Sequence, residues 1–199
     1  MRNLADKLTQ FIMVKGIIHE EDYALYHYGL QTGMELMLCV IISVIIASKL
    51  DIFRQSFVVA VVLFALRAYI CGIHMKKYIA CLISSTVLIT VGPFLVNNIS
   101  LSKNVIIAVS IVLMALLHKL SYVTIAYHSD EEEIQFFTKQ RKRILSIVFV
   151  VILVLWLWNK SGYLMQICYA LTVACLSVVL EIIRIKVTKE KNVWKRIKK

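Results

Sequence analysis

His74 and Cys81 are the two residues of this chain whose types could do chemistry together. They lie seven residues apart in the stretch RAYICGIHMKKYIAC, which runs from Arg67 to Cys81. A thiol becomes an effective nucleophile when a neighbouring base takes its proton, and an imidazole is the usual base. The pair therefore points to nucleophilic catalysis by a cysteine.

The chain must break between these two residues if they are to act together. On one continuous helix, seven residues rise about 10.5 Å, which is too far for an imidazole and a thiol to share a hydrogen bond. Gly72 and the consecutive Lys76 and Lys77 favour a turn here. We expect His74 in that turn and Cys81 in the first turns of the next helix, where the helix N-terminus and the two lysines favour thiolate.

The composition indicates an integral membrane protein. Of the 199 residues, 60% are hydrophobic, and the mean hydropathy is +0.78. This balance does not fit a soluble domain. We predict an all-α polytopic helical bundle, with residues 1–199 as a single domain and six apolar segments, some of them re-entrant or tilted. The segments are Tyr28–Ser48, Ser56–Ile73, Tyr78–Val96, Ile99–Leu117, Ile144–Trp158 and Tyr163–Leu180.

The cations predict the orientation. With six crossings and the N-terminus inside, all but four of the 23 lysines and arginines fall on the cytoplasmic side. This agrees with the positive-inside rule, so both termini and the turn between His74 and Cys81 are expected to face the cytoplasm. The net charge of +11 is then explained by anionic lipid headgroups, and nucleic-acid binding is not implied. The four exceptions are Lys49, Arg54, Lys103 and Lys160.

Three polar segments surround the apolar ones. Residues 1–20 carry apolar positions at helical spacing between charges, which predicts an amphipathic helix in the membrane interface. Residues 118–143 form a cytoplasmic basic loop, within which Ser129 and Glu132 fit a capping box for a short helix. Residues 186–199 form a basic C-terminal tail of similar interfacial character.

Smaller signals concern helix packing. Gly92 and Pro93 should end or kink the third span. Gly29 and Gly33 form a small-residue pair that suits a close helix contact or a dimer contact. Three further cysteines lie in apolar spans and are interpreted as packing residues without a disulfide framework. They are Cys39, Cys168 and Cys175.

Each candidate residue also has a structural interpretation. Cys81 could be a small apolar packing residue and His74 an interfacial side chain. A metal site is a rival for both, because Cys71 would add a third ligand, but the spacing matches no common zinc pattern and no fourth ligand is evident. We therefore expect no metal and no cofactor.

The candidate auxiliary residues also have both a functional and a structural interpretation. Arg67 could orient a substrate carboxylate or hold the turn. Ser84 and Ser85 lie one turn beyond Cys81 and could donate to an oxyanion or bond their own backbone. A basic cluster could attract an acidic substrate segment, although anchoring to lipid is favoured. Its members are Lys139, Arg141, Lys142 and Arg143.

The order Arg67, Gly72, His74 and Cys81, after a second hydrophobic segment in a basic chain of this length, resembles the AgrB family, accessory gene regulator protein B. The chain differs from the usual pattern at Cys71, where the family has a glycine. The resemblance implies a bacterial cell-membrane cysteine endopeptidase that processes AgrD-type precursors of cyclic quorum-sensing peptides. It also implies a homodimer.

By that resemblance, Cys81 is the nucleophile and His74 is its general base. Cleavage would release the C-terminal tail of the precursor and leave an acyl thioester on Cys81, which a thiol or hydroxyl of the peptide would displace to close a thiolactone or lactone. The alternative is a non-enzymatic membrane protein, either a small transporter or a scaffold. A transporter would favour repeated halves with matched broken helices, and these are not apparent.

Overall fold

The computed structural model describes residues 2–70, 78–99, 101–128 and 131–197, and side chains within 4–70, 79–99, 101–126 and 131–188. These residues form seven α-helices and a short 3-10 helix, η1, with no strand among them, as the all-α prediction requires. The elements are α1 (Arg2–Val14), η1 (Glu20–Asp22), α2 (Tyr23–Lys49), α3 (Phe53–Arg67), α4 (Tyr78–Val96), α5 (Lys103–His128), α6 (Glu131–Leu157) and α7 (Ser161–Ile197).

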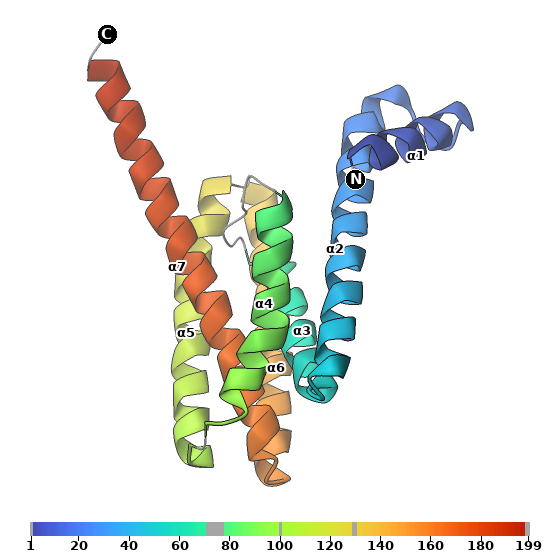
Figure 1. Ribbon diagram of the computed structural model, residues 1–199. Coiled ribbons are helices and arrows are strands. Elements are labelled where there is room, and N and C mark those ends of the chain that lie inside the picture. Colours follow the sequence, from blue (N-terminus) through green and yellow to red (C-terminus); the bar gives the residue numbers. More distant parts are fainter. Residues whose placement is uncertain (1, 71–77, 100, 129–130, 198–199) are drawn as a thin grey trace.

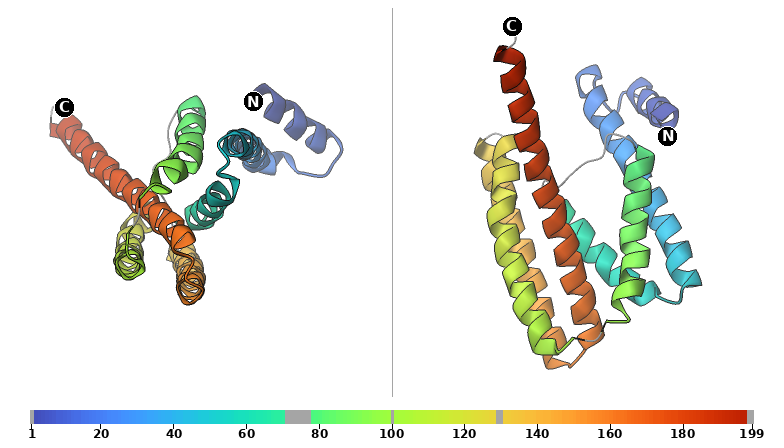
Figure 2. Two further views of the ribbon diagram at one scale, coloured as in Figure 1. Left: turned by 60° about the horizontal axis from the view of Figure 1, so that its bottom comes forward. Right: turned by 60° about the vertical axis from the view of Figure 1, so that its left-hand side comes forward.

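The helices α2, α4, α5 and α6 run in roughly the same direction, α7 is tilted relative to them, the shorter α3 lies obliquely, and α1 lies across the first turns of α2 (Figures 1 and 2). We name the two ends of this bundle after residues of α4. At the Cys81 end, uppermost in Figure 1, α5 finishes and α4 and α6 begin, while α3 runs toward this end and finishes short of it. At the Pro93 end, α4 and α6 finish and α5 and α7 begin. Both chain termini lie toward the Cys81 end.

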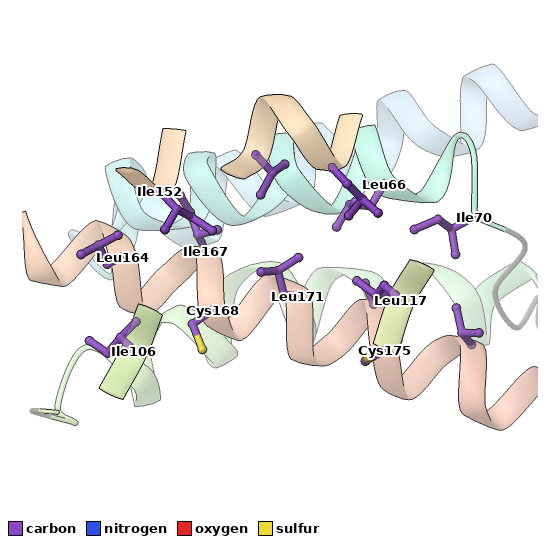
Figure 3. Close-up of a cluster of buried hydrophobic side chains, with 14 residues drawn as sticks. Leu66, Ile70, Ile106, Leu117, Ile152, Leu164, Ile167, Cys168, Leu171 and Cys175 are labelled. Carbon is purple, nitrogen blue, oxygen red and sulfur yellow. The ribbon is translucent and has the colours of Figure 1, made fainter. Parts of the chain in front are cut away.

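The core lies where α7 packs against α3, α5 and α6. Leu117 of α5 and Leu171 of α7 are completely buried, and Leu66 of α3 and Ile152 of α6 join the same cluster. Figure 3 shows these side chains converging from the surrounding helices onto α7. Branched aliphatic side chains at helical spacing can interlock in this way to interior density. The helix α7 is therefore the central element that positions the others.

The helix α2 is held more loosely, through α4 and α1. Cys39 and Thr86 bring α2 and α4 together, with Sγ and Oγ1 3.8 Å apart. Asp6 Oδ1 of α1 lies 2.8 Å from His27 Nε2 of α2. Most of the remaining surface of α2 is exposed and apolar, as expected of a helix that faces lipid.

Four helices are long and apolar enough to cross a membrane, among the residues described. The other two helices of the bundle, α3 and α6, are not among the four. The helix α3 has 15 residues, so it spans about 22 Å against a hydrocarbon core of about 30 Å, and the first half of α6 is charged. The count of six crossings and the orientation stay predictions. The four qualifying ranges are Glu20–Lys49, Ile79–Val96, Lys103–Ala126 and Ser161–Thr188.

Several boundaries differ from the sequence prediction. The segment 118–143 is not mainly a loop, because α5 continues to His128 and α6 runs unbroken from Glu131 into the apolar segment. The short helix expected there is thus the start of α6. Ser129, its predicted cap, lies outside the described residues. The basic tail after Ile185 is likewise helical, as the last part of α7.

The predictions for the glycines have different outcomes. A Cβ at Gly29 or Gly33 would meet no atom within 4 Å, so no described part of this chain packs closely on them. Gly92, in contrast, lies directly against the ring of Tyr169, and a Cβ there would overlap the tyrosine. The helix α4 continues past Pro93 and ends at Val96.

A candidate active-site cavity

The segment predicted to carry the chemistry begins in one helix and ends in another. The helix α3 ends at Arg67, the residues that follow up to Ile70 form turns and a bend, and α4 is described from Tyr78. Cys81 therefore lies within the first described turn of α4. Gly72 and His74, with Cys71, lie outside the described residues, so the contact between His74 and Cys81 stays a prediction.

Arg67 and Ser85 connect the end of α3 to the start of α4. The Arg67 guanidinium donates through Nη1 to Ser85 Oγ at 3.3 Å. Ser85 follows Cys81 by one helical turn, so the two side chains share one face of α4. The hydrogen bond therefore holds the last residue of α3 beside the face of α4 that carries the thiol.

Ser84 has a different arrangement. Its hydroxyl donates to the Cys81 carbonyl at 3.0 Å, three residues back in the same helix. This is the backbone bond that serines in helices commonly make. Of the two candidate oxyanion donors, Ser84 thus already donates to the backbone, whereas Ser85 accepts from Arg67 and keeps its hydroxyl hydrogen for donation.

Cys81 lines a cavity of about 290 Å³ between α3, α4 and α7. The lining is mostly apolar, and its polar members are Arg67, Cys81 and three serines. The side chains come from one face of each helix, at spacings of three and four residues. The lining residues are Leu63, Phe64, Leu66, Arg67, Ile70, Cys81, Ser84, Ser85, Leu88, Ile89, Val173, Ala174, Leu176, Ser177 and Leu180.

Contacts nearer the Pro93 end keep α4 and α7 together. Gln166 Nε2 donates to the Pro93 carbonyl at 3.3 Å, and Tyr169 Oη donates to the Leu88 carbonyl at 3.1 Å. The absence of a side chain at Gly92 lets the Tyr169 ring approach. From there the two helices diverge toward the Cys81 end (Figures 1 and 2). The cavity lies in this widening part of the contact.

The basic cluster of α6 does not line this cavity. Arg141 is only 2% exposed and donates through Nη1 to Ser121 Oγ of α5 at 2.9 Å. Lys142 and Arg143 are exposed, and Arg143 donates to Gln140 Oε1 at 3.3 Å. The prediction of one cluster acting on lipid or substrate is therefore wrong for Arg141, whose side chain is enclosed between helices.

The wall contributed by α7 was missed by sequence reasoning. Val173, Ala174 and Ser177 lie more than 90 residues after Cys81, yet they complete the cavity. A signal was present, because Ala170, Ala174 and Ser177 put small side chains on one face of an otherwise bulky span. Small residues at this spacing commonly mark a face to which other elements come close.

The other cysteines behave as predicted. Cys39, Cys168 and Cys175 are buried and free, and Cys168 and Cys175 belong to the hydrophobic core (Figure 3). Within the described ranges, no three His, Cys, Asp or Glu side chains form a group that could hold a metal ion. Two of the three ligands of the metal alternative, Cys71 and His74, lie outside those ranges, so that alternative is untested.

The fold and the cavity together define an α-helical membrane protein with a cysteine in a largely apolar cavity between helices. The chain belongs to the AgrB family: the model of accessory gene regulator B matches residues 5–185, which is most of its length. Membership implies a part in the processing of agr quorum-sensing peptides, with an AgrD-type peptide as the substrate. No curated protein and no solved structure matches the chain.

Proposed function

We propose that this protein is a membrane cysteine endopeptidase that removes the C-terminal tail of an AgrD-type precursor, with Cys81 as nucleophile and His74 as general base. The observation that carries the proposal is the cavity itself. A thiol lines about 290 Å³ of space beside Arg67 and Ser85, within a membrane protein of the AgrB family. This space beside the thiol suits a bound peptide segment.

The first step is acyl transfer to the enzyme. His74 takes the Cys81 proton, and the sulfur attacks the carbonyl carbon of one precursor peptide bond. The carbon–nitrogen bond then breaks, and the departing amine of the tail receives the proton from His74. The products are a free tail peptide and a thioester between Cys81 and the remaining precursor.

The second step closes the ring. A thiol or hydroxyl of the bound peptide attacks the thioester carbon, and the Cys81 sulfur leaves and regains a proton. The thioester keeps the acyl group reactive, and an apolar cavity limits the water that would otherwise hydrolyse it. The product is a thiolactone or a lactone.

Arg67 and Ser85 support these steps from the rim of the cavity. Ser85 accepts a hydrogen bond from Arg67, so its own hydroxyl is suited to donate to the oxyanion that forms during attack. Arg67 acts as a positioning residue that fixes Ser85, and its charge suits a precursor carboxylate. Gly72, which lies outside the described residues, keeps its expected role of allowing the chain to break before His74.

The surroundings proposed for the protein are the bacterial cell membrane, with both termini and the Cys81 end in the cytoplasm. Leu4, Leu8 and Phe11 of α1 are exposed along one face, which suits insertion among the headgroups of anionic lipids. The open face of α2 at Gly29 and Gly33 suits the homodimer expected from the family.

The deciding experiment compares release of the tail by wild type, Cys81→Ala and His74→Ala at equal membrane abundance. Cys71→Ala and Cys175→Ala are matched controls, because one removes a neighbouring thiol and the other a buried one. We expect loss of cleavage in the first two variants only, and a precursor fragment attached to Cys81 in mass spectra of wild type. Unimpaired cleavage by Cys81→Ala would overturn the proposal and favour the scaffold alternative.

A further inference from the structure

The cavity beside Cys81 is larger than the nucleophile needs. An apolar protein cavity of about 150 Å³ is enough to hold benzene, and this one measures about 290 Å³. It therefore has room for an aromatic ring or a branched aliphatic side chain together with part of its backbone.

On the α4 and α7 walls of the cavity, two of the serines donate hydrogen bonds to backbone carbonyls. Ser84 donates to the Cys81 carbonyl and Ser177 donates to the Ala174 carbonyl at 2.8 Å. The rest of those walls is aliphatic, and only the rim at Arg67 and Ser85 is strongly polar. A polar side chain that entered would lose its water without adequate replacement, which is costly, whereas an apolar one would gain free energy.

The position of the thiol decides which substrate residue occupies the space. The residue that provides the attacked carbonyl stays bonded to the Cys81 sulfur after the tail has left. A pocket that contains this sulfur therefore surrounds that residue during both steps, while the first residue of the tail leaves with its amine. The acyl-side residue is therefore the occupant that remains beside the sulfur through both steps.

We propose, resting on the function proposed above, that this cavity is the specificity pocket for an apolar side chain on the acyl side of the cleaved bond. The helix α7 sets its size. Val173, Ala174 and Ser177 form the wall opposite Cys81, and the small Ala174 and Ser177 leave the space that a longer side chain would fill. By filling the pocket, the correct side chain also excludes water from the thioester, so that ring closure competes well with hydrolysis.

Two substitutions on α7 change this space in opposite directions. Ser177→Leu narrows the pocket without removing a hydrogen bond between helices, because the Ser177 hydroxyl donates to the Ala174 carbonyl within α7. Val173→Ala widens it, with little risk of overpacking. Val179→Phe is the matched control, since Val179 lies on the same helix, is 37% exposed and does not line the cavity.

The probes are synthetic AgrD-type precursors with Ala, Leu or Phe at the residue before the cleaved bond, which is first located by mass spectrometry of the released tail. We expect wild type to prefer Leu or Phe to Ala by about 10- to 200-fold in kcat/KM. Ser177→Leu should lower the Phe-to-Ala ratio about 10-fold or more, and Val173→Ala should raise the Phe-to-Leu ratio. The Ala precursor should also give more linear, hydrolysed product.

Two outcomes separate the inference from the proposed function. If Cys81→Ala releases no tail, yet the α7 variants change all three precursors by the same factor, the pocket assignment is wrong and the peptidase stands. If Cys81→Ala still releases tail, the peptidase proposal fails and the pocket with it. A changed ratio in Val179→Phe would also contradict the assignment, because that side chain is outside the cavity.

Discussion

Two arginines at the Cys81 end of the bundle make the same hydrogen bond in opposite settings. Arg67 donates to Ser85 across α3 and α4, and Arg141 donates to Ser121 across α5 and α6. Arg67 is exposed and borders the cavity together with Ser85, whereas Arg141 is 2% exposed. The residue types alone therefore do not decide the role, because the packing of the helices around each pair does.

The difference arises from what surrounds the two contacts. Leu117 and Leu145 lie one turn from Ser121 and Arg141 and are buried in the core, so the contact between α5 and α6 is sealed. No carboxylate pairs with Arg141 among the described residues, and its Nε has no hydrogen-bond partner. A buried cation without a counter-charge is costly. We therefore expect Arg141 to stabilise the contact between α5 and α6 through the packing of its aliphatic stem more than through its charge.

The largest expected effect is a loss of stability at the contact between Arg141 and Ser121. Arg141→Ala should lower the free energy of unfolding by about 2–5 kcal/mol, because it leaves a cavity between tightly packed helices. Arg141→Met keeps most of the side-chain volume and removes the buried charge, so it should be close to neutral. Thermal unfolding in detergent micelles measures both, with the exposed Arg143→Ala as control. A Met variant as unstable as the Ala variant would show that the guanidinium itself is required.

Substitution at the contact between Arg67 and Ser85 should affect activity more than stability. Arg67→Met should leave stability nearly unchanged, because the residue is exposed, but should slow tail release about 100-fold through misplacement of Ser85 and the substrate. The loss should fall on kcat more than on KM, and Arg67→Lys, which keeps a donor, should recover part of it. Equal losses of processing in Arg67→Met and Arg141→Met would abolish the contrast between the two arginines.

Ser85 should show a smaller effect than Arg67. Its bond to Arg67 is long, and a single hydrogen bond contributes about 0.5–1.5 kcal/mol net, so Ser85→Ala should slow tail release by up to about 10-fold. Ser84→Ala is the internal control, because Ser84 donates to its own helix backbone, and its loss should matter less. The rates of the two single variants at saturating precursor provide the test. A larger loss in Ser84→Ala would reassign the oxyanion donor.

These contacts also show how far the sequence can be read. Local patterns were sufficient for the existence of the helical segments and for the placement of Ser85 one turn beyond Cys81, because each depends on spacing within a short stretch. They extended the second span to Ile73, whereas α3 ends at Arg67. The burial of Arg141 could not be predicted from the residues next to it in the sequence, since it depends on Ser121 and on the core around α7. A run of four basic residues gives no sign of which one turns inward.

The α7 wall illustrates the same limit for the candidate site. Ala174 and Ser177 are ordinary residues of an apolar span, and only the path of α7 past α4 gives them a role. That path depends on Gly92 and Tyr169, which are themselves far apart in the chain. Contacts of this kind follow from packing between distant segments, and a single sequence contains no direct record of them.

The smallest expected effect concerns the exposed part of the basic cluster. Arg141 faces inward, whereas Lys139, Lys142 and Arg143 are exposed, and the last two directly follow Arg141 in the chain. The double variant Lys142→Gln with Arg143→Gln should slow processing less than about threefold in vesicles with anionic lipid, since each exposed charge acts weakly. The loss should vanish in 1 M salt, where the Debye length is about 3 Å.

Vesicles of neutral lipid then separate the two roles for these cations. If they anchor the protein to headgroups, wild type and the double variant should process the precursor equally there, because no anionic lipid is present. If they attract an acidic segment of the precursor, the difference should persist in neutral vesicles and appear in KM. We expect the first result, because both side chains are exposed and neither lines the cavity that Arg67 borders, where the precursor would bind.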